Sequence, residues 1–124
     1  MLQDPYLLDE TARPVVLRAI QRHCAYREWS LLAAHVRTNH VHVIVDTSRA
    51  GDRAETRPER IMNEFKSYSS RELNLLPGET PGRKRWARHG STRWLWKDQD
   101  VNRALQYVVD EQGVPMTLFV AGEL

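Results

Sequence analysis

Apolar side chains recur at helical spacing in the first part of the chain. Between residues 9 and 27 they fall three or four positions apart, which places them on one side of a helix. Pro14 lies inside the first turns of this stretch, where proline is tolerated because the first backbone N–H groups need no partner within the helix. We therefore predict a first helix over about residues 9–27, whose inner positions are Val16, Ala19, Ile20, His23 and Cys24.

The pattern then changes to two β-rich runs, WSLLAAHVRT and HVHVIVDT, separated only by the region around Thr38 and Asn39. Such a pair predicts an antiparallel hairpin. In the second strand, side chains alternate between faces. His40, His42 and Ile44 share one face, and we expect the valines at 41, 43 and 45 to meet the first two helices.

The rest of the chain alternates between polar loops and further elements. SRAGDRAETRP predicts an exposed loop, followed by a second helix over about residues 58–75. RWARHGSTRWLWK predicts two short strands around the turn at residues 90–91. A third helix, capped by Asp98 or Asp100, should stop before Gly113 and Pro115, and MTLFVAGEL then forms a last strand or docks on the core. The predicted fold is a single α+β domain over residues 1–124, with helices laid on an antiparallel sheet.

Composition narrows the functional classes. The one cysteine, Cys24, excludes an internal disulfide and a zinc site of paired thiolates, and fits a reducing compartment such as the cytoplasm. No apolar run is long enough to span a bilayer, so no membrane partner is expected. The net charge of +2 is only a mild bias.

Basic and aromatic residues are concentrated in residues 83–97. Guanidinium groups and indoles together suit the phosphates and unstacked bases of a nucleic-acid strand. A solvated hairpin with core tryptophans explains the segment equally well. The residues concerned are Arg83, Lys84, Arg85, Arg88, Arg93 and Lys97, interleaved with Trp86, Trp94 and Trp96.

His40 and His42 are candidate metal ligands, because two imidazoles on adjacent same-side positions of a strand can converge on one ion. A His-x-His triplet alone is more often an ordinary strand, and two ligands leave a metal incompletely bound. The third helix offers the missing parts. Tyr107 borders its apolar stripe, Glu111 lies one turn further on, and Gln112 is a competing third ligand. Tyr107 as a core-edge residue with its hydroxyl in water is the alternative.

These residue types suit the cleavage of a phosphodiester. A metal ion neutralises charge on the non-bridging oxygens, and a tyrosine stores the energy of the broken strand as an ester. Two histidines with one carboxylate or amide favour Mg²⁺ or Mn²⁺.

At this point the sequence resembles the single-tyrosine HUH transposases, a family that includes insertion-sequence and REP-associated tyrosine transposases. The similarity runs from about residue 11 to residue 113. It is carried by ARPVVLRAIQRHC, by VRTNHVHVIVDT, by ERIMNEFKSYSSREL and by WARHGSTRWLWKDQDVNRALQYVVDEQG. The most specific parts are NHVHV, the helix with Phe65 and Lys66, and the closing tyrosine helix.

The resemblance implies a ferredoxin-like antiparallel sheet and DNA transposition through a 5′-phosphotyrosine intermediate. His40 and His42 would hold the metal, Glu111 or Gln112 would complete its site, and Tyr107 would be the catalytic nucleophile. It also implies single-stranded or hairpin DNA as substrate and a homodimer, with the tyrosine helix acting in its own subunit or in the partner. The residues expected to touch DNA are Lys66, Arg88, Arg93 and Lys97.

Family members generally have a further strand before the first helix, and only a short lead precedes that helix in this sequence. If that strand is missing, the sheet and the activity would be weakened. Two alternatives therefore stay open: an inactive transposase-derived module that binds DNA, and a hydrolase in which His40, His42 and Glu111 activate water.

The remaining chemically versatile side chains have structural interpretations. His23 and Cys24 are expected in the core, His35 in packing, and His89 in a turn with a phosphate contact as the alternative. Tyr68 is the one serious competitor for the role of nucleophile.

Overall fold

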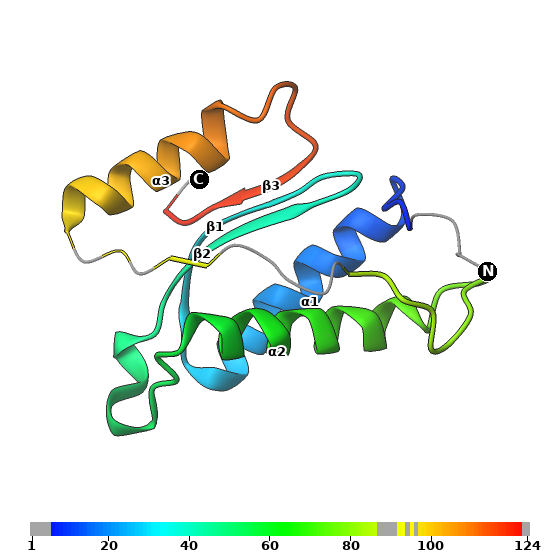
Figure 1. Ribbon diagram of the computed structural model, residues 1–124, viewed down its shortest axis with the longest axis horizontal. Helices are drawn as coiled ribbons and strands as arrows, with labels where there is room; N and C mark the ends of the chain where they lie inside the picture. Colours follow the sequence, from blue (N-terminus) through cyan, green and yellow to red (C-terminus); the bar gives the residue numbers. More distant parts are fainter. Residues whose placement is uncertain (1–5, 87–91, 94, 96, 123–124) are drawn as a thin grey trace.

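The computed structural model describes residues 6–86, 92–93, 95 and 97–122. A three-stranded sheet lies at its centre, with the order β2-β1-β3, and both neighbouring pairs are antiparallel (Figure 1). In chain order the elements are α1 (Ala12–Arg27), β1 (Ser30–Val36), β2 (Val41–Asp46), the 3₁₀ helix η1 (Ser48–Arg53), α2 (Pro58–Leu73), α3 (Asp98–Asp110) and β3 (Thr117–Val120).

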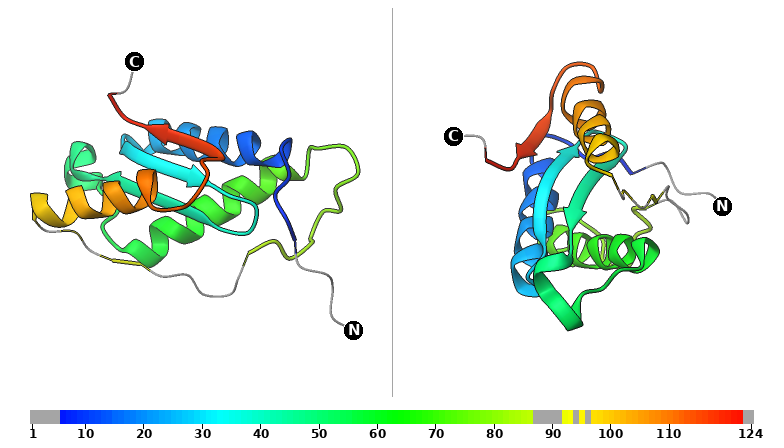
Figure 2. Two further views of the ribbon diagram at one scale, coloured as in Figure 1. Left: turned by 90° about the horizontal axis from the view of Figure 1, so that it is seen from above. Right: turned by 90° about the vertical axis from the view of Figure 1, so that its left-hand side faces the viewer.

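The helices lie on both faces of this sheet. α1 and α3 occupy opposite faces, and α2 packs against α1 (Figure 2). The larger hydrophobic cluster joins the valines of β2 to buried residues of α1 and α2, including Val16, Ile20 and Phe65. A smaller cluster joins Ile44 to Val108 of α3. The predicted α+β sandwich is confirmed, and none of the described helices is long and apolar enough to cross a membrane.

The ends of the first two helices differ slightly from the prediction. α1 begins at Ala12, because the Asp9 carboxylate accepts the backbone N–H groups of Thr11 and Ala12 and turns the chain into the helix. α2 ends at Leu73, since Leu75 and Leu76 donate to carbonyls only three residues back. The hairpin of β1 and β2 is confirmed.

The third helix departs further from the prediction. Lys97 is the N-cap residue and no side chain caps the helix, so the prediction of Asp98 or Asp100 as cap was wrong. Both aspartates lie in the first turn instead, where a carboxylate is favoured by the helix dipole.

The segments around α3 also differ. Within the predicted hairpin at 85–97, the residues that the structure describes form no strand, and residues 87–91, 94 and 96 lie outside them. The tail forms β3, which pairs with β1, so the last strand follows α3. No strand precedes α1 within residues 6–11.

His35 on the central strand ties β1 to α3 and to the chain entering β3. Its ring is fully buried. Nδ1 donates to the carbonyl oxygen of Val108 at 3.1 Å, and Nε2 accepts the N–H of Met116 at 3.0 Å. Burial lowers the pKa of His35, which favours the neutral ring that this donor–acceptor pair requires. His35 therefore has the structural role that its position on the strand predicted.

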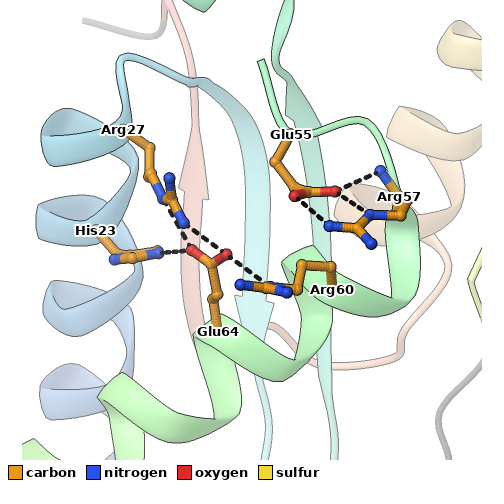
Figure 3. Close-up of polar contacts among 6 residues, drawn as sticks. All are labelled: His23, Arg27, Glu55, Arg57, Arg60 and Glu64. Atoms are coloured by element: carbon orange, nitrogen blue, oxygen red, sulfur yellow. Dashed lines mark hydrogen bonds and ion pairs between the residues drawn. The ribbon is translucent and has the colours of Figure 1, made fainter. Parts of the chain in front are cut away.

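A second polar cluster joins α1 to α2 (Figure 3). The Glu64 carboxylate accepts from His23 Nε2 at 2.6 Å and from Arg27 at 2.9 and 2.8 Å. Arg60, one turn earlier on α2, lies 3.6 Å away. Burial alone would raise the pKa of Glu64, but the hydrogen bonds from Arg27 and His23 outweigh it and lower that pKa. His23 is thus satisfied in place by a carboxylate.

We predict that Glu64→Gln lowers the free energy of unfolding by about 1–2 kcal/mol at neutral pH. The neutral amide loses the charge-assisted bonds to His23 and Arg27, and the partial exposure of Arg27 keeps this loss small. The folded pKa of Glu64 lies below its ordinary value, so its contribution is complete above the unfolded pKa and is lost as pH falls through the folded one. Urea unfolding across this range should show the gap between variant and parent closing in acid. Glu28→Gln, which removes an exposed pair with Arg53, is the matched control and should change little.

We also predict that His35→Leu costs about 2–4 kcal/mol, since the Val108 carbonyl and the Met116 N–H would both lose their partner. Hydrogen exchange should accelerate first in α3 and β3. Equal stability and equal exchange in variant and parent would show that these two bonds do not hold the elements together.

Candidate active site

His40 and His42 are brought together at the start of β2. Their ring centroids lie 4.9 Å apart with the planes nearly perpendicular. His40 is exposed, and its Nδ1 lies 2.7 Å from the side-chain oxygen of Asn39. With the Asn39 oxygen as acceptor, the proton stays on Nδ1 and leaves the lone pair on Nε2 for a ligand.

His42 combines a buried ring nitrogen that lacks a hydrogen-bond partner in the described residues with a lowered pKa. Its Nε2 is buried and has no hydrogen-bond partner among the residues that the structure describes. Burial lowers the pKa of this ring, and the neighbouring His40 lowers it further. A buried nitrogen without a partner, on a ring whose neutral form is favoured, fits a metal ligand, because metals bind the neutral form of histidine.

α3 places Tyr107 over the same face of the sheet. Its stripe of Ala104, Leu105 and Val108 packs on Ala33 and Ile44. The Tyr107 ring, next to this stripe, then lies 5.7 Å from the His42 ring, centroid to centroid, in an edge-on arrangement. Half of the tyrosine side chain stays exposed. The structure thus brings together His40, His42 and Tyr107 within a single chain.

The two candidate third ligands differ in placement. Glu111 is the exposed C-cap residue of α3. Within the described part of the chain, no three His, Cys, Asp or Glu side chains form a group that could hold a metal, so Glu111 does not form such a group with the two histidines. Gln112 is half-buried, and its Nε2 donates to the Tyr107 carbonyl at 3.3 Å.

The Gln112 side chain also interacts with His42. This interaction raises the pKa of His42 and so opposes part of the effect of burial. This contact places the Gln112 amide beside the ring of His42.

Two of the predicted DNA-contacting residues line the same cavity as the histidines and the tyrosine. This cavity, about 860 Å³ in volume, follows the edge strand β2 and is bordered by Lys66 of α2 and by Arg93. Lys97 is exposed at the start of α3 and does not line it. Arg88 lies outside the described residues, as do Trp94, Trp96 and His89.

Other members of the basic and aromatic segment are structural. Trp86 packs against the larger cluster, and its Nε1 donates to the Lys66 carbonyl and to Ser70 Oγ. Arg85 is buried in an ion pair with Glu79 at 3.2 Å. Trp86 thus fits the core interpretation, and Arg85 has a structural ion pair, although both also line the cavity.

The remaining candidates, Tyr68 and Cys24, lie away from the face of the sheet that carries the two histidines. Tyr68 of α2 stacks on His23 with centroids 4.3 Å apart, beside a small cleft between α1 and α2. Cys24 is buried, and burial raises the pKa of its thiol to about 12, so it is not a reactive thiolate. Asn39 and Arg37 were missed by sequence reasoning. Alternation along β1 places Arg37 on the same face as His35, and the register that pairs His35 with His42 makes this the histidine face.

A comparison with known families shows which group of proteins the chain resembles. Residues 5–104 match the family described as "Transposase IS200 like", a match that includes His40 and His42 and ends three residues before Tyr107. No curated protein and no solved structure is similar enough to match. The chain belongs to the IS200-like transposase family, which supports a role in DNA transposition.

Proposed function

We propose that this protein cleaves and rejoins single-stranded DNA, with Tyr107 as the catalytic nucleophile beside a divalent metal. The observation that carries the proposal is the position of the Tyr107 ring, 5.7 Å from the ring of His42 on one sheet face of one chain.

His40 and His42 would hold the metal through their Nε2 atoms, with Gln112 as third ligand. The donor set of two imidazoles and an amide, open to water on the exposed His40 side, is compatible with Mg²⁺ or Mn²⁺. When bound, the ion neutralises charge on the non-bridging oxygens of the scissile phosphate.

Tyr107 carries out the chemical step in this proposal. Its Oη attacks phosphorus, a bond between Oη and phosphorus forms, and the bond from phosphorus to the 3′ oxygen breaks. The phenolic proton passes to water, which reaches this half-exposed side chain, and the departing 3′ oxygen takes up a proton. The product is a 5′-phosphotyrosine. A later 3′-OH can attack this ester and rejoin a strand, which frees Tyr107.

Lys66 and Arg93 border the path that the DNA strand would follow into the site. Arg88 and Lys97 remain predicted contacts. The substrate class is single-stranded or hairpin DNA, the place of action is the cytoplasm, and the assembly is a homodimer. Because Tyr107 lies beside the histidines of its own chain, we propose that each subunit uses its own tyrosine.

We predict that Tyr107→Phe abolishes a denaturation-resistant adduct with labelled single-stranded hairpin DNA in the presence of Mn²⁺, because only the hydroxyl can form the ester. Affinity for the same DNA should stay within about twofold, since one exposed hydroxyl contributes little to binding. Denaturing gel electrophoresis measures the adduct.

Tyr68→Phe is the matched control, being a second tyrosine with an accessible ring on another face, and should retain the adduct. Adduct formation by Tyr107→Phe would refute the proposed nucleophile. Cleavage without an adduct in that variant would favour the hydrolase in which water attacks.

The third ligand can be tested without DNA. We predict that Gln112→Ala weakens Mn²⁺ binding about tenfold or more, as loss of a ligand or its orienting partner does in metal sites, whereas Glu111→Gln leaves it nearly unchanged. Electron paramagnetic resonance of free Mn²⁺ measures the affinity, and His42→Ala gives the baseline. The opposite ranking of the two variants would assign the position to Glu111.

A further inference from the structure

Arg37 shares the face of the sheet that carries the histidines. His35 pairs with His42 across the hairpin, so Arg37, two residues further along the chain, points to the same side. Its backbone N–H donates to the His40 carbonyl at 2.9 Å, which makes Arg37 and His40 direct neighbours at the turn. Its positive charge contributes to the lowered pKa of both His35 and His42.

The guanidinium is held in place by the loop that follows α3. Nη1 donates to the Val114 carbonyl at 2.9 Å. Gly113, with φ of +76°, lies so close that a Cβ built on it would be 3.8 Å from Nη2. This loop also contains Gln112, so the guanidinium lies between the two segments that supply the proposed metal ligands.

Within the part of the chain that the structure describes, no carboxylate forms an ion pair with Arg37. The ion pairs of the described residues involve other arginines, and the Val114 carbonyl is the one hydrogen-bond acceptor found there for the Arg37 side chain. A guanidinium has five N–H donors in a fixed fork that matches phosphate oxygens. A half-buried cation with donors to spare, next to two imidazoles and a phenol, fits an anionic ligand.

We propose that Arg37 binds a non-bridging phosphate oxygen of the DNA strand that enters the site of Tyr107. This inference rests on the proposed function for the identity of the ligand. Arg37 would orient the strand at the turn between β1 and β2, whereas the metal acts on the scissile phosphate itself. An arginine that served only to hold the Val114 carbonyl would make no contact with DNA.

The test measures binding without chemistry. The unmodified chain and its Arg37→Gln variant are titrated with fluorescent single-stranded oligothymidylate in EDTA over a series of salt concentrations. We expect Arg37→Gln to bind about tenfold more weakly and the slope of log affinity against log salt to shrink by about 0.7, the value for one phosphate contact on a single strand. Arg37→Lys should keep the slope, because its ammonium still neutralises a phosphate.

Arg49→Gln is the matched control, since Arg49 also donates to backbone carbonyls, those of Glu28 and Trp29, at the far end of the hairpin. It should bind as the parent does. If Arg37→Gln keeps the parental affinity and slope, the proposal is wrong and Arg37 only supports the loop.

A second measurement avoids any loss of folding in the variant. In the unmodified protein, the Nε–H nuclear magnetic resonance signal of Arg37 should shift on addition of oligothymidylate, and an unchanged signal would overturn the proposal. Because neither measurement depends on cleavage, a protein that forms no adduct but shows both effects would refute the nucleophile and retain the phosphate contact.

Discussion

The arrangement of the site depends on two hydrogen bonds made by one buried imidazole. His35 lies on the central strand, donates to the carbonyl of Val108 and accepts from the N–H of Met116. Val108 is the residue after Tyr107, so the position of the phenol follows from the bond that its neighbour makes. Hydrophobic contacts of Leu105 and Val108 hold the helix on the sheet, but apolar packing alone tolerates sliding. The directional bond to His35 restricts the rotation and translation of α3.

The two faces of β2 have different roles: one packs into the hydrophobic core, and the other carries the two histidines. Val41, Val43 and Val45 face the cluster shared with α1 and α2, which anchors the strand. On the other face only Ile44 is packed into the smaller cluster, and the face near the turn is left to the two histidines. Because successive side chains of a strand point to opposite faces, packing the valines into the core also determines the direction in which the imidazoles point.

Much of this arrangement could be predicted from the sequence, because it follows from periodicity. The alternation of HVHVIV assigns the histidines to one face, and the apolar stripe of α3 predicts which side of that helix meets it. The family resemblance then linked the two. What could not be predicted depends on single turns: Lys97 as the N-cap residue, and the end of α3 at Asp110, which brings Gln112 rather than Glu111 toward His42. Periodicity does not determine where a helix ends, and one residue there rotates the next side chain by about 100°.

The segment between α2 and α3 was the other place where the sequence left alternatives open. Basic and aromatic residues there were compatible with a nucleic-acid surface and with a structural hairpin. Trp86 is hydrogen-bonded to Ser70 and Arg85 is paired with Glu79, whereas Arg93 is exposed, and all three line the cavity. Composition gives the same weight to each of these residues, and only tertiary contacts separate them.

The same contacts bear on whether the tyrosine helix can serve a partner subunit. For α3 to leave its own sheet, the Val108 carbonyl would lose the His35 donor, and Ala33, Ile44 and Leu105 would be uncovered. Each unsatisfied buried group costs about 1–3 kcal/mol, and exposure of the apolar surface adds to that cost. If two subunits exchanged α3, each helix would regain the same hydrogen bond and the same apolar contacts in an identical pocket of the partner. The free energies of the two arrangements would then differ only by the strain in the segments that link α3 to the rest of the chain. Within this chain the helix is already docked beside His42, so under the proposed function the site needs no tyrosine from a second copy.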